Sequence, residues 1–354
     1  MKDKALVFSE NEFGKIDGKV ANGLVRHSEQ YEIVGIIDST KAGLDAGEYL
    51  DGMKKGIPIF RSTEDALNNL MYIPEYFIYG IAPLDSFLDK EQRQIIITAM
   101  EHRMNIVNGL PEFFTEDEEF MQKAIECNVK IFDIRKPPKR KDLHLFTGEI
   151  FKIKTPVIII AGTDCAVGKM TTARNIVETL KRENINAVFI ATGQAGLLQG
   201  AKYGMALDVL TSGFATGEVE KAIIDAVNAE HPDIIIVEGQ GGLSHPAFNS
   251  SIAIIKGANP DAIIIQHPPK RKNRCDFPSI PMPALKYEIE LNELFSKSKV
   301  IAITINNDDM TDAELEETII EYEERYKLPT TDVLKYGSDK IIKRIYEVFP
   351  EIQT

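Results

Sequence analysis

The sequence predicts an α/β protein with two parallel sheets, in which a Rossmann-like N-terminal domain precedes a P-loop NTPase-like domain. Three observations lead to this prediction. Short apolar runs alternate with segments of helical periodicity along the whole chain, as in parallel sheets covered by helices. The 354 residues exceed the usual size of one hydrophobic core, so two domains are expected. Finally, residues 156–172 combine an apolar run, a glycine turn, a lysine and a helix start.

The N-terminal domain is predicted to span residues 1–138. Its short apolar runs have the length and composition of strands, and the segment 91–103 carries apolar residues at helical spacing. The charged segment Lys136–Asp142 contains two prolines, which interrupt both patterns, so we place the domain boundary there. Strands are expected at 5–8, 32–38, 76–81, 105–108 and 130–134.

The second domain is predicted to span residues 139–354. Its apolar runs are nearly continuous, as in strands that are buried on both faces of a sheet. Helices are expected at 169–182, 312–325 and 338–348. Strands are expected at 156–161, 187–192, 233–237, 262–266 and 299–305.

Composition excludes several classes of protein. A net charge of −13 would repel a nucleic-acid backbone, and the basic clusters 135–141 and 270–274 are either solvated faces or local binding groups. No apolar run is long enough to span a bilayer, and Met1–Phe8 has a strand pattern, not that of a signal peptide. The three cysteines are widely spaced and form no CxxC pair. We therefore expect a cytoplasmic protein that acts on a small molecule and binds neither membrane nor nucleic acid.

The strongest motif is a phosphate-binding loop. A glycine turn between a buried strand and a helix presents backbone N–H groups and the helix dipole to phosphate oxygens, and a lysine after the second glycine neutralises their charge. All of these parts are present around Gly162, Gly168 and Lys169. The residues expected to bind a cofactor are Gly162, Thr163, Asp164, Cys165, Ala166, Val167, Gly168, Lys169, Met170, Thr171 and Thr172.

Two departures from the common P-loop pattern weaken the case for a metal. Five residues, and not four, separate Gly162 from Gly168, and Met170 stands where a hydroxyl side chain normally binds Mg²⁺. If the reaction uses Mg²⁺, we expect Thr171 and Glu238 to hold it.

A second motif, Glu238-Gly-Gln-Gly-Gly242, ends the buried strand 233–237. Ligands bind at the carboxyl ends of parallel strands, so Glu238 is a candidate metal ligand or general base. His245 follows the turn and is either a second general base or a histidine bonded to the backbone. The predicted catalytic residues are thus Lys169, Glu238 and His245.

Other strand ends supply candidate substrate contacts. The turn that begins after Thr192 offers backbone N–H groups to an anion, and the basic cluster 270–274 offers guanidinium groups to a dicarboxylate or to further phosphates. The residues expected to bind substrate are Gln194, Gly241, Gly242, His267, Lys270, Arg271 and Arg274.

The N-terminal domain lacks the GxGxxG pattern of dinucleotide-binding domains, although Asp38 ends the second strand where a ribose-binding acid would lie. We therefore expect this domain to cover the active site or to build the interface of a homo-oligomer, without binding a dinucleotide.

The motifs resemble two known groups of proteins. GTDCAVGK (162–169) is similar to the GTDTxVGK loop of dethiobiotin synthetase, and VEGQGG (237–242) is similar to its VEGxGG segment. Over nearly its full length the chain resembles the DgcN-type D-glutamate N-acetyltransferase family, which also has a Rossmann-like N-terminal domain. That resemblance rests on residues 162–173, 212–220, 238–248 and 259–269.

The DgcN-type resemblance implies transfer of an acetyl group from acetyl-CoA to the amine of D-glutamate or a similar amino acid. The phosphates of acetyl-CoA suit a P-loop that lacks the Mg²⁺ hydroxyl. Two alternatives stay open at this point. The dethiobiotin-synthetase resemblance implies an ATP- and Mg²⁺-dependent carboxylate ligase or kinase, and the N-terminal domain is compatible with a non-catalytic nucleotide- or NAD-binding module.

Overall fold

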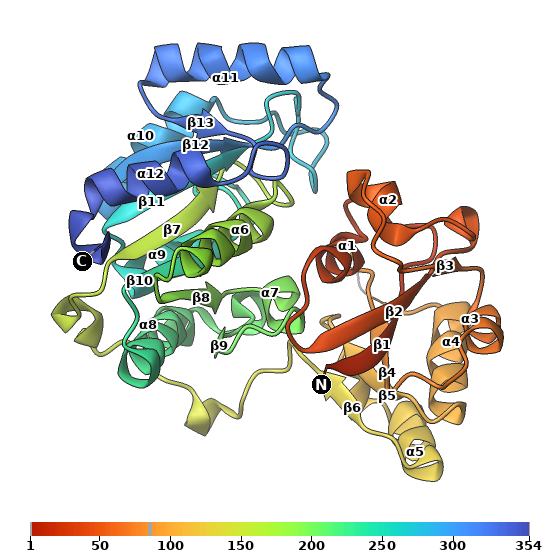
Figure 1. Cartoon of the computed structure of the whole chain (residues 1–354). Helices are drawn as coiled ribbons and strands as arrows, with labels where there is room; N and C mark the ends of the chain where they lie inside the picture. Colours follow the sequence, from red (N-terminus) through yellow and green to blue (C-terminus); the bar gives the residue numbers. More distant parts are fainter. Residues whose placement is uncertain (1, 84–86, 354) are drawn as a thin grey trace. The chain divides into compact units, whose positions relative to one another are not determined.

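The structure is a computed structural model that describes residues 2–83 and 87–353 (Figure 1). The chain forms two compact units. The first comprises Met1–Pro137 and Gln194–Ala201, and the second comprises Pro138–Gly193 and Lys202–Thr354. Each unit contains one parallel sheet with helices on both faces, so the predicted α/β fold class is confirmed.

The first unit has a six-stranded parallel sheet in the order β3-β2-β1-β4-β5-β6. This is the strand order of a Rossmann fold, which places a reversal of strand order between β1 and β4. The strands are β1 (Asp3–Phe8), β2 (Tyr31–Ile37), β3 (Ile59–Phe60), β4 (Tyr76–Tyr79), β5 (Asn105–Asn108) and β6 (Ile131–Asp133).

Two apolar layers hold the helices of the first unit against the sheet. One layer joins the sheet to α1, α2 and α7, and the other joins it to α3, α4 and α5. Asp89 and Gln92 form a capping box that fixes the start of α4. The helices are α1 (Lys19–Arg26), α2 (Ala46–Asp51), α3 (Thr63–Asn69), α4 (Lys90–Glu101), α5 (Glu118–Cys127) and α7 (Gln194–Leu198).

The second unit has a seven-stranded parallel sheet in the order β13-β12-β11-β7-β10-β8-β9. Every residue of its central strand β7 is buried, as the continuous apolar run predicted. The strands are β7 (Val157–Gly162), β8 (Ala187–Ala191), β9 (Tyr203–Gly204), β10 (Ile234–Glu238), β11 (Ala262–His267), β12 (Lys299–Ile305) and β13 (Thr330–Thr331).

Helices cover both faces of this second sheet (Figure 1). Apolar residues of α8, α9, α10 and α11 form one continuous core with the strands. The helix α6 packs against α12 and against β7, β8 and β10. The helices are α6 (Lys169–Arg182), α8 (Ser212–Glu230), α9 (Ser250–Ala258), α10 (Leu285–Ser296), α11 (Asp312–Tyr326) and α12 (Asp339–Val348). Short 3₁₀ turns lie at Ser39–Lys41, Phe114–Glu116, Arg140–Asp142, Glu149–Lys152, Leu207–Val209 and Pro350–Gln353.

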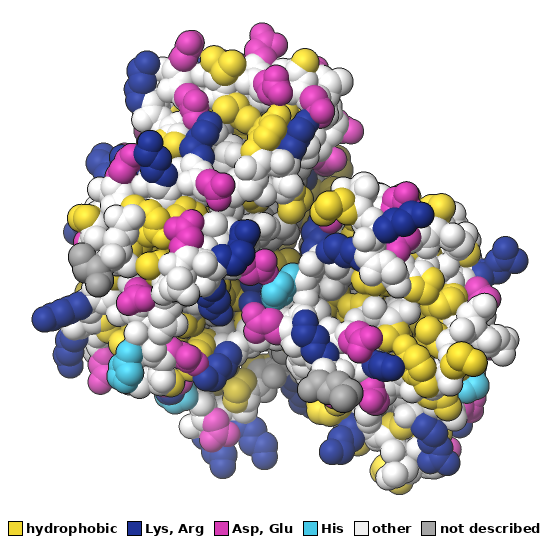
Figure 2. Space-filling view, in the orientation of Figure 1, with side chains coloured by type: hydrophobic (Ala, Val, Ile, Leu, Met, Phe, Trp, Pro, Cys, Tyr) yellow, Lys and Arg dark blue, Asp and Glu magenta, His cyan; other side chains and the backbone are white. Residues whose placement is uncertain are grey.

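The surface is mixed in charge. Figure 2 shows acidic side chains along α11, at the top of the drawing, and basic side chains among acidic ones elsewhere on the face that it presents. Within the described ranges, no helix has both the length and the apolar character needed to cross a membrane.

Candidate functional site

The P-loop connects β7 to α6 and has the backbone conformation of an anion-binding nest. Ala166 and Gly168 adopt left-handed φ angles of +47° and +103°, and the second of these is readily adopted by glycine alone. Within residues 2–83 and 87–353, the backbone N–H groups of 164–168 donate to no acceptor. The loop thus offers several free donors beside the start of a helix, which is an arrangement that binds phosphate oxygens.

Lys169 adds a positive charge to this nest. Its side chain is buried, and Nζ donates a hydrogen bond to the carbonyl oxygen of Asp164 at 2.6 Å. Burial lowers the pKa of the ammonium group, because a charged group loses hydration inside the protein. A phosphate bound in the loop would therefore meet a poorly hydrated cation that it can stabilise.

Asp164 joins the P-loop to the basic loop 270–274. Its buried carboxylate accepts from Nη1 of Arg271 at 3.2 Å, from Nη1 of Arg274 at 3.5 Å and from the backbone N–H of Cys275 at 2.9 Å. Arg274 also donates to the carbonyl oxygen of Thr163 at 3.1 Å and to Oγ of Ser244 at 2.9 Å. The buried guanidinium of Arg274 is thus part of the framework of the P-loop.

Arg271 and Lys270 have different surroundings. Arg271 donates from Nη1 to the carbonyl oxygen of Cys165 at 2.8 Å and from Nη2 to that of Ala166 at 3.1 Å. Lys270 lies outside this cluster and forms an ion pair with Glu314 on α11. The sequence placed these basic residues together, but the structure divides them between the P-loop and the surface.

Two residues at the end of β11 contact the P-loop and the first turn of α6. His267 Nδ1 lies 2.9 Å from Oγ1 of Thr163, and burial lowers the pKa of this histidine to about 4, so its ring is neutral near pH 7. Gln266 accepts hydrogen bonds from the hydroxyl of Thr172, at 2.6 Å, and from that of Thr304. The hydroxyl of Thr172 therefore already donates to a side chain of the protein.

Glu238 ends β10, the strand next to β7 in the sheet. It is 5% exposed, and Oε2 accepts the backbone N–H of Thr192 at 3.0 Å. Burial raises the pKa of the carboxyl group to about 7 despite this hydrogen bond and the nearby charge of Lys169. A carboxyl with such a pKa exchanges protons in the range that general acid–base catalysis requires.

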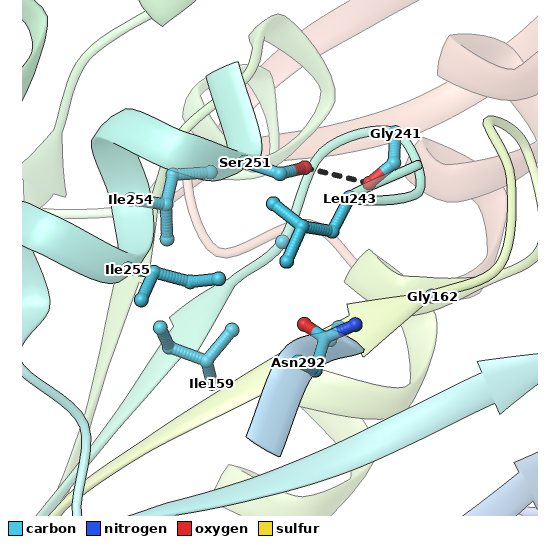
Figure 3. Close-up of a pocket in the computed structure, with 10 residues that line it drawn as sticks. Ile159, Gly162, Gly241, Leu243, Ser251, Ile254, Ile255 and Asn292 are labelled. Carbon is cyan, nitrogen blue, oxygen red and sulfur yellow. Dashed lines mark hydrogen bonds between the residues drawn. The ribbon is translucent and has the colours of Figure 1, made fainter. Parts of the chain in front are cut away.

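Glycines let the turn after β10 approach the P-loop closely. A Cβ atom on Gly242 would lie 2.6 Å from the carbonyl oxygen of Thr163, and one on Gly241 would lie 3.3 Å from Sγ of Cys165. Behind this turn lies a cavity of about 10 Å³, in which Ile159, Leu243, Ile254 and Ile255 face one another (Figure 3). Ser251 donates to the carbonyl oxygen of Gly241 there at 2.7 Å. The cavity has room for one water and none for a substrate.

His245 lies beside the P-loop with a hydrogen-bonding pattern that selects its tautomer. Nδ1 accepts the backbone N–H of Ala247 at 3.2 Å, so the neutral ring carries its proton on Nε2. That nitrogen is buried, makes no hydrogen bond within the described ranges, and lies 3.6 Å from Oδ1 of Asp164. Burial, and then the charge of Arg274, lower the pKa of the ring. His245 is thus placed to donate a hydrogen bond.

The P-loop and the segment after β10 together present a group of potential metal ligands. In the described part of the chain, Asp164, Cys165 and His245 present ligand atoms within 4.8 Å of one another. Two guanidinium groups already pair with the carboxylate of Asp164, however, and a divalent cation would be repelled by them. This group therefore does not fit a metal. The suggested Mg²⁺ ligands Thr171 and Glu238 form no part of it and stay an untested prediction.

Two further residues that the sequence singled out, Gln194 and Asp38, belong to the first unit. Gln194 begins α7, which belongs to the first unit. Asp38 lies in the same unit and accepts hydrogen bonds from the backbone N–H of Phe13 at 3.2 Å and from Nζ of Lys41 at 2.8 Å. The hydrogen bond from Lys41, together with one from Thr40, holds its pKa below the usual range against the opposing effect of burial. The carboxylate of Asp38, which the sequence suggests for a ribose site, is thus already hydrogen-bonded to groups of its own domain.

Sequence reasoning missed some residues of this framework. Glu288 on α10 is fully buried, accepts the backbone N–H of Ser244 at 3.1 Å and also bonds its hydroxyl. Burial raises the pKa of this carboxyl. Glu288 shares one face of α10 with Leu285 and Asn292, and the structure shows that all three are buried, although two of the three are polar. Gln266 lies within the apolar pattern of β11, which carries no local signal of its contacts with Thr172 and Thr304.

Comparisons with known proteins identify similar chains. A family model described as the P-loop domain of DUF1611, a domain of unknown function, matches residues 144–342, and one described as its Rossmann-like domain matches residues 39–137. In the crystal structure of a DUF1611 family protein from Anabaena variabilis the same fold recurs, with a TM-score of 0.89 and 27% identity. The match covers 98% of this chain and 100% of that one.

Two curated relatives carry the name D-glutamate N-acetyltransferase. The protein from a Pseudoalteromonas species is 34% identical over 275 residues, which are 76% of this chain and 80% of the relative. The protein from Tritonibacter scottomollicae is 26% identical over 277 residues, which are 77% of this chain and 81% of the relative.

Proposed function

The chain belongs to the DUF1611 family, and from this premise we propose that it is an N-acetyltransferase that moves the acetyl group of acetyl-CoA to the amine of D-glutamate or a similar amino acid. The names of the two relatives support the enzyme class and the acceptor. The site supports a cofactor that carries phosphates.

The observation that carries the proposal is a P-loop that is suited to phosphates and in which Met170 replaces the usual metal-binding hydroxyl. The free N–H groups of 164–168 and the ammonium of Lys169 would hold the phosphates of acetyl-CoA. Met170 occupies the usual position of the metal-binding hydroxyl, and the hydroxyl of Thr172 is bonded to Gln266. Acetyl-CoA supplies an activated acetyl group, so no phosphate has to be cleaved.

The transfer itself requires the removal of a proton from the acceptor ammonium. The free amine then forms a C–N bond with the acetyl carbonyl carbon, the C–S bond breaks, and the proton that the new amide nitrogen loses passes to the thiolate of CoA. Among the three predicted catalytic residues, Glu238 has a pKa of about 7 and fits the role of base. His245 presents Nε2–H and fits the role of donor to a developing negative charge. Lys169 fits the role of phosphate ligand.

The test is to incubate the protein with acetyl-CoA and a panel of D- and L-amino acids and to follow free thiol. We expect thiol release with D-glutamate or a close analogue, accompanied by the N-acetylated product in a mass spectrum. No thiol release with any amino acid would overturn the proposal. A parallel assay with ATP, Mg²⁺ and carboxylates addresses the ligase alternative, since ADP formation that depends on both would support that chemistry in its place.

A further inference from the structure

A cavity of about 580 Å³ opens within the second unit, against the basic loop that follows β11. It is bounded by the loop after β11, by the segment 282–285 and by α11. Its volume is in the range of sites for nucleotides and cofactors, and it is several times larger than an amino acid such as glutamate requires.

One wall of the cavity is aromatic. The rings of His267 and Tyr322 have centroids 6.1 Å apart, and Tyr322 meets Tyr326 edge to face at 5.5 Å. His267 is neutral near pH 7, because burial lowers its pKa to about 4. The wall is therefore uncharged and aromatic, with Tyr326 partly exposed beside the buried rings of His267 and Tyr322, and an exposed aromatic ring is a group on which a purine base packs.

The rim of the cavity is cationic. Its lining includes the basic side chains Lys270, Arg271, Lys272 and Arg325 and a single carboxylate, that of Glu321. Lys272 is exposed and has no carboxylate partner in the described ranges, whereas Lys270 pairs with Glu314. Arg325 is 60% exposed, pairs with Glu321 at 3.4 Å and lies 5.5 Å from the ring centroid of Tyr326, so a bound phosphate would compete with the exposed carboxylate of Glu321 for this guanidinium. A ligand with a second anionic group could therefore bind that group to these cations, apart from the phosphates in the P-loop.

Arg271 connects the cavity to the P-loop. It lines the cavity and donates to the carbonyl oxygens of Cys165 and Ala166 at 2.8 Å and 3.1 Å. His267 makes a similar connection through Thr163, at 2.9 Å. The cavity and the P-loop thus have the side chains of Arg271 and His267 as common neighbours.

We propose that this cavity binds the adenosine 3′-phosphate end of acetyl-CoA, with the adenine against Tyr322 and Tyr326 and the 3′-phosphate at Lys272 and Arg325. The inference rests on the proposed function and extends it to a defined part of the cofactor. A nucleoside triphosphate carries all its phosphates in one chain, which the P-loop alone can hold. The rim cations match a ligand with a separate phosphate on the ribose.

The test compares CoA with 3′-dephospho-CoA by titration calorimetry. The wild-type protein should bind CoA roughly tenfold or more tightly, because charge-assisted hydrogen bonds to the 3′-phosphate are lost in the analogue. The variant Lys272→Ala/Arg325→Gln should lose this preference, with weaker binding of CoA and unchanged binding of 3′-dephospho-CoA. Lys343→Ala, an exposed lysine on α12, should keep the preference and serves as the matched control.

The outcomes separate this inference from the proposed function. If the wild-type protein binds CoA and 3′-dephospho-CoA equally well, the cavity does not bind the 3′-phosphate. The same conclusion follows if the double variant has equally weakened affinity for both compounds. If the double variant instead raises the KM for the amino acid and leaves CoA binding intact, the cavity belongs to the acceptor. Each of these results would overturn this inference and would leave the proposed function standing. A folded wild-type protein that binds neither compound would overturn the proposed function as well. Near-ultraviolet circular dichroism should confirm that the variant is folded.

Discussion

Replacement of Glu238 by glutamine should stabilise the protein at neutral and alkaline pH and at the same time remove activity. The carboxyl is 5% exposed, and its pKa is raised from 4.5 to about 7 by burial. Each pKa unit corresponds to about 1.4 kcal/mol, so the ionised carboxylate costs the folded protein about 3 kcal/mol above pH 7. The amide of glutamine is neutral at every pH, and its oxygen can still accept the N–H of Thr192.

The sign of the pH dependence follows from the proton balance. Between pH 4.5 and 7 the folded protein holds this proton and the unfolded chain has released it, so stability falls as the pH rises through this window. Below pH 4.5 both states are protonated, and Glu238→Gln should have no effect through charge. From pH 5 to pH 8 its stabilising effect should grow by about 2–3 kcal/mol.

The assay is urea denaturation of the wild type and of Glu238→Gln at pH 5 and pH 8. Comparing the change in the variant with the change in the wild type removes the contribution of other titrating groups. Glu290→Gln, on the exposed side of α10, should show no such gain. An equal effect of Glu238→Gln at both pH values would refute the argument that burial penalises this carboxylate. Activity of the wild type should rise as the pH increases through about 7, and the variant should lack this limb.

Three further substitutions test the P-loop and its framework. Lys169→Met should weaken CoA binding by roughly 10- to 100-fold in a titration, since a charge-assisted hydrogen bond is lost, without lowering the thermal midpoint. Asp164→Asn should lower the midpoint strongly, because about 3–5 kcal/mol is lost when a buried guanidinium has no carboxylate. Gly242→Ala places a Cβ 2.6 Å from the carbonyl oxygen of Thr163 and should destabilise by about 1–3 kcal/mol, whereas Gly213→Ala, with open space around its Cβ, should not.

Each of these three predictions can be contradicted by a specific result. Unchanged CoA affinity in Lys169→Met would show that the phosphates bind elsewhere. A midpoint for Asp164→Asn equal to that of the wild type would mean that the two arginines are solvated and not held by this carboxylate. Equal stability of Gly242→Ala and Gly213→Ala would show that the turn after β10 can move away from the P-loop.

The local sequence pattern was sufficient to predict the long helices and strands of the fold. The helix expected at 169–182 is observed as Lys169–Arg182, because a glycine at the N-cap and helical periodicity mark its ends. The strands β3, β9 and β13 were not predicted, since each has two residues and its position depends on pairing with a longer neighbour. The association of Gln194–Ala201 with the first unit was also unforeseen, because Leu198 contributes to a core that is remote in sequence.

The sequence by itself determined the phosphate-binding loop, since a strand, a glycine turn, a lysine and a helix start are all contained in residues 157–182. Only the tertiary structure decided what surrounds that loop. The carboxylate of Asp164 meets Arg271 and Arg274, more than 100 positions away in the chain. The protonation of Glu238 likewise depends on burial by several strands and helices. Hydrogen-bond donors of a turn are a local property of the chain, whereas desolvation and ion pairing depend on which distant segments the fold brings together.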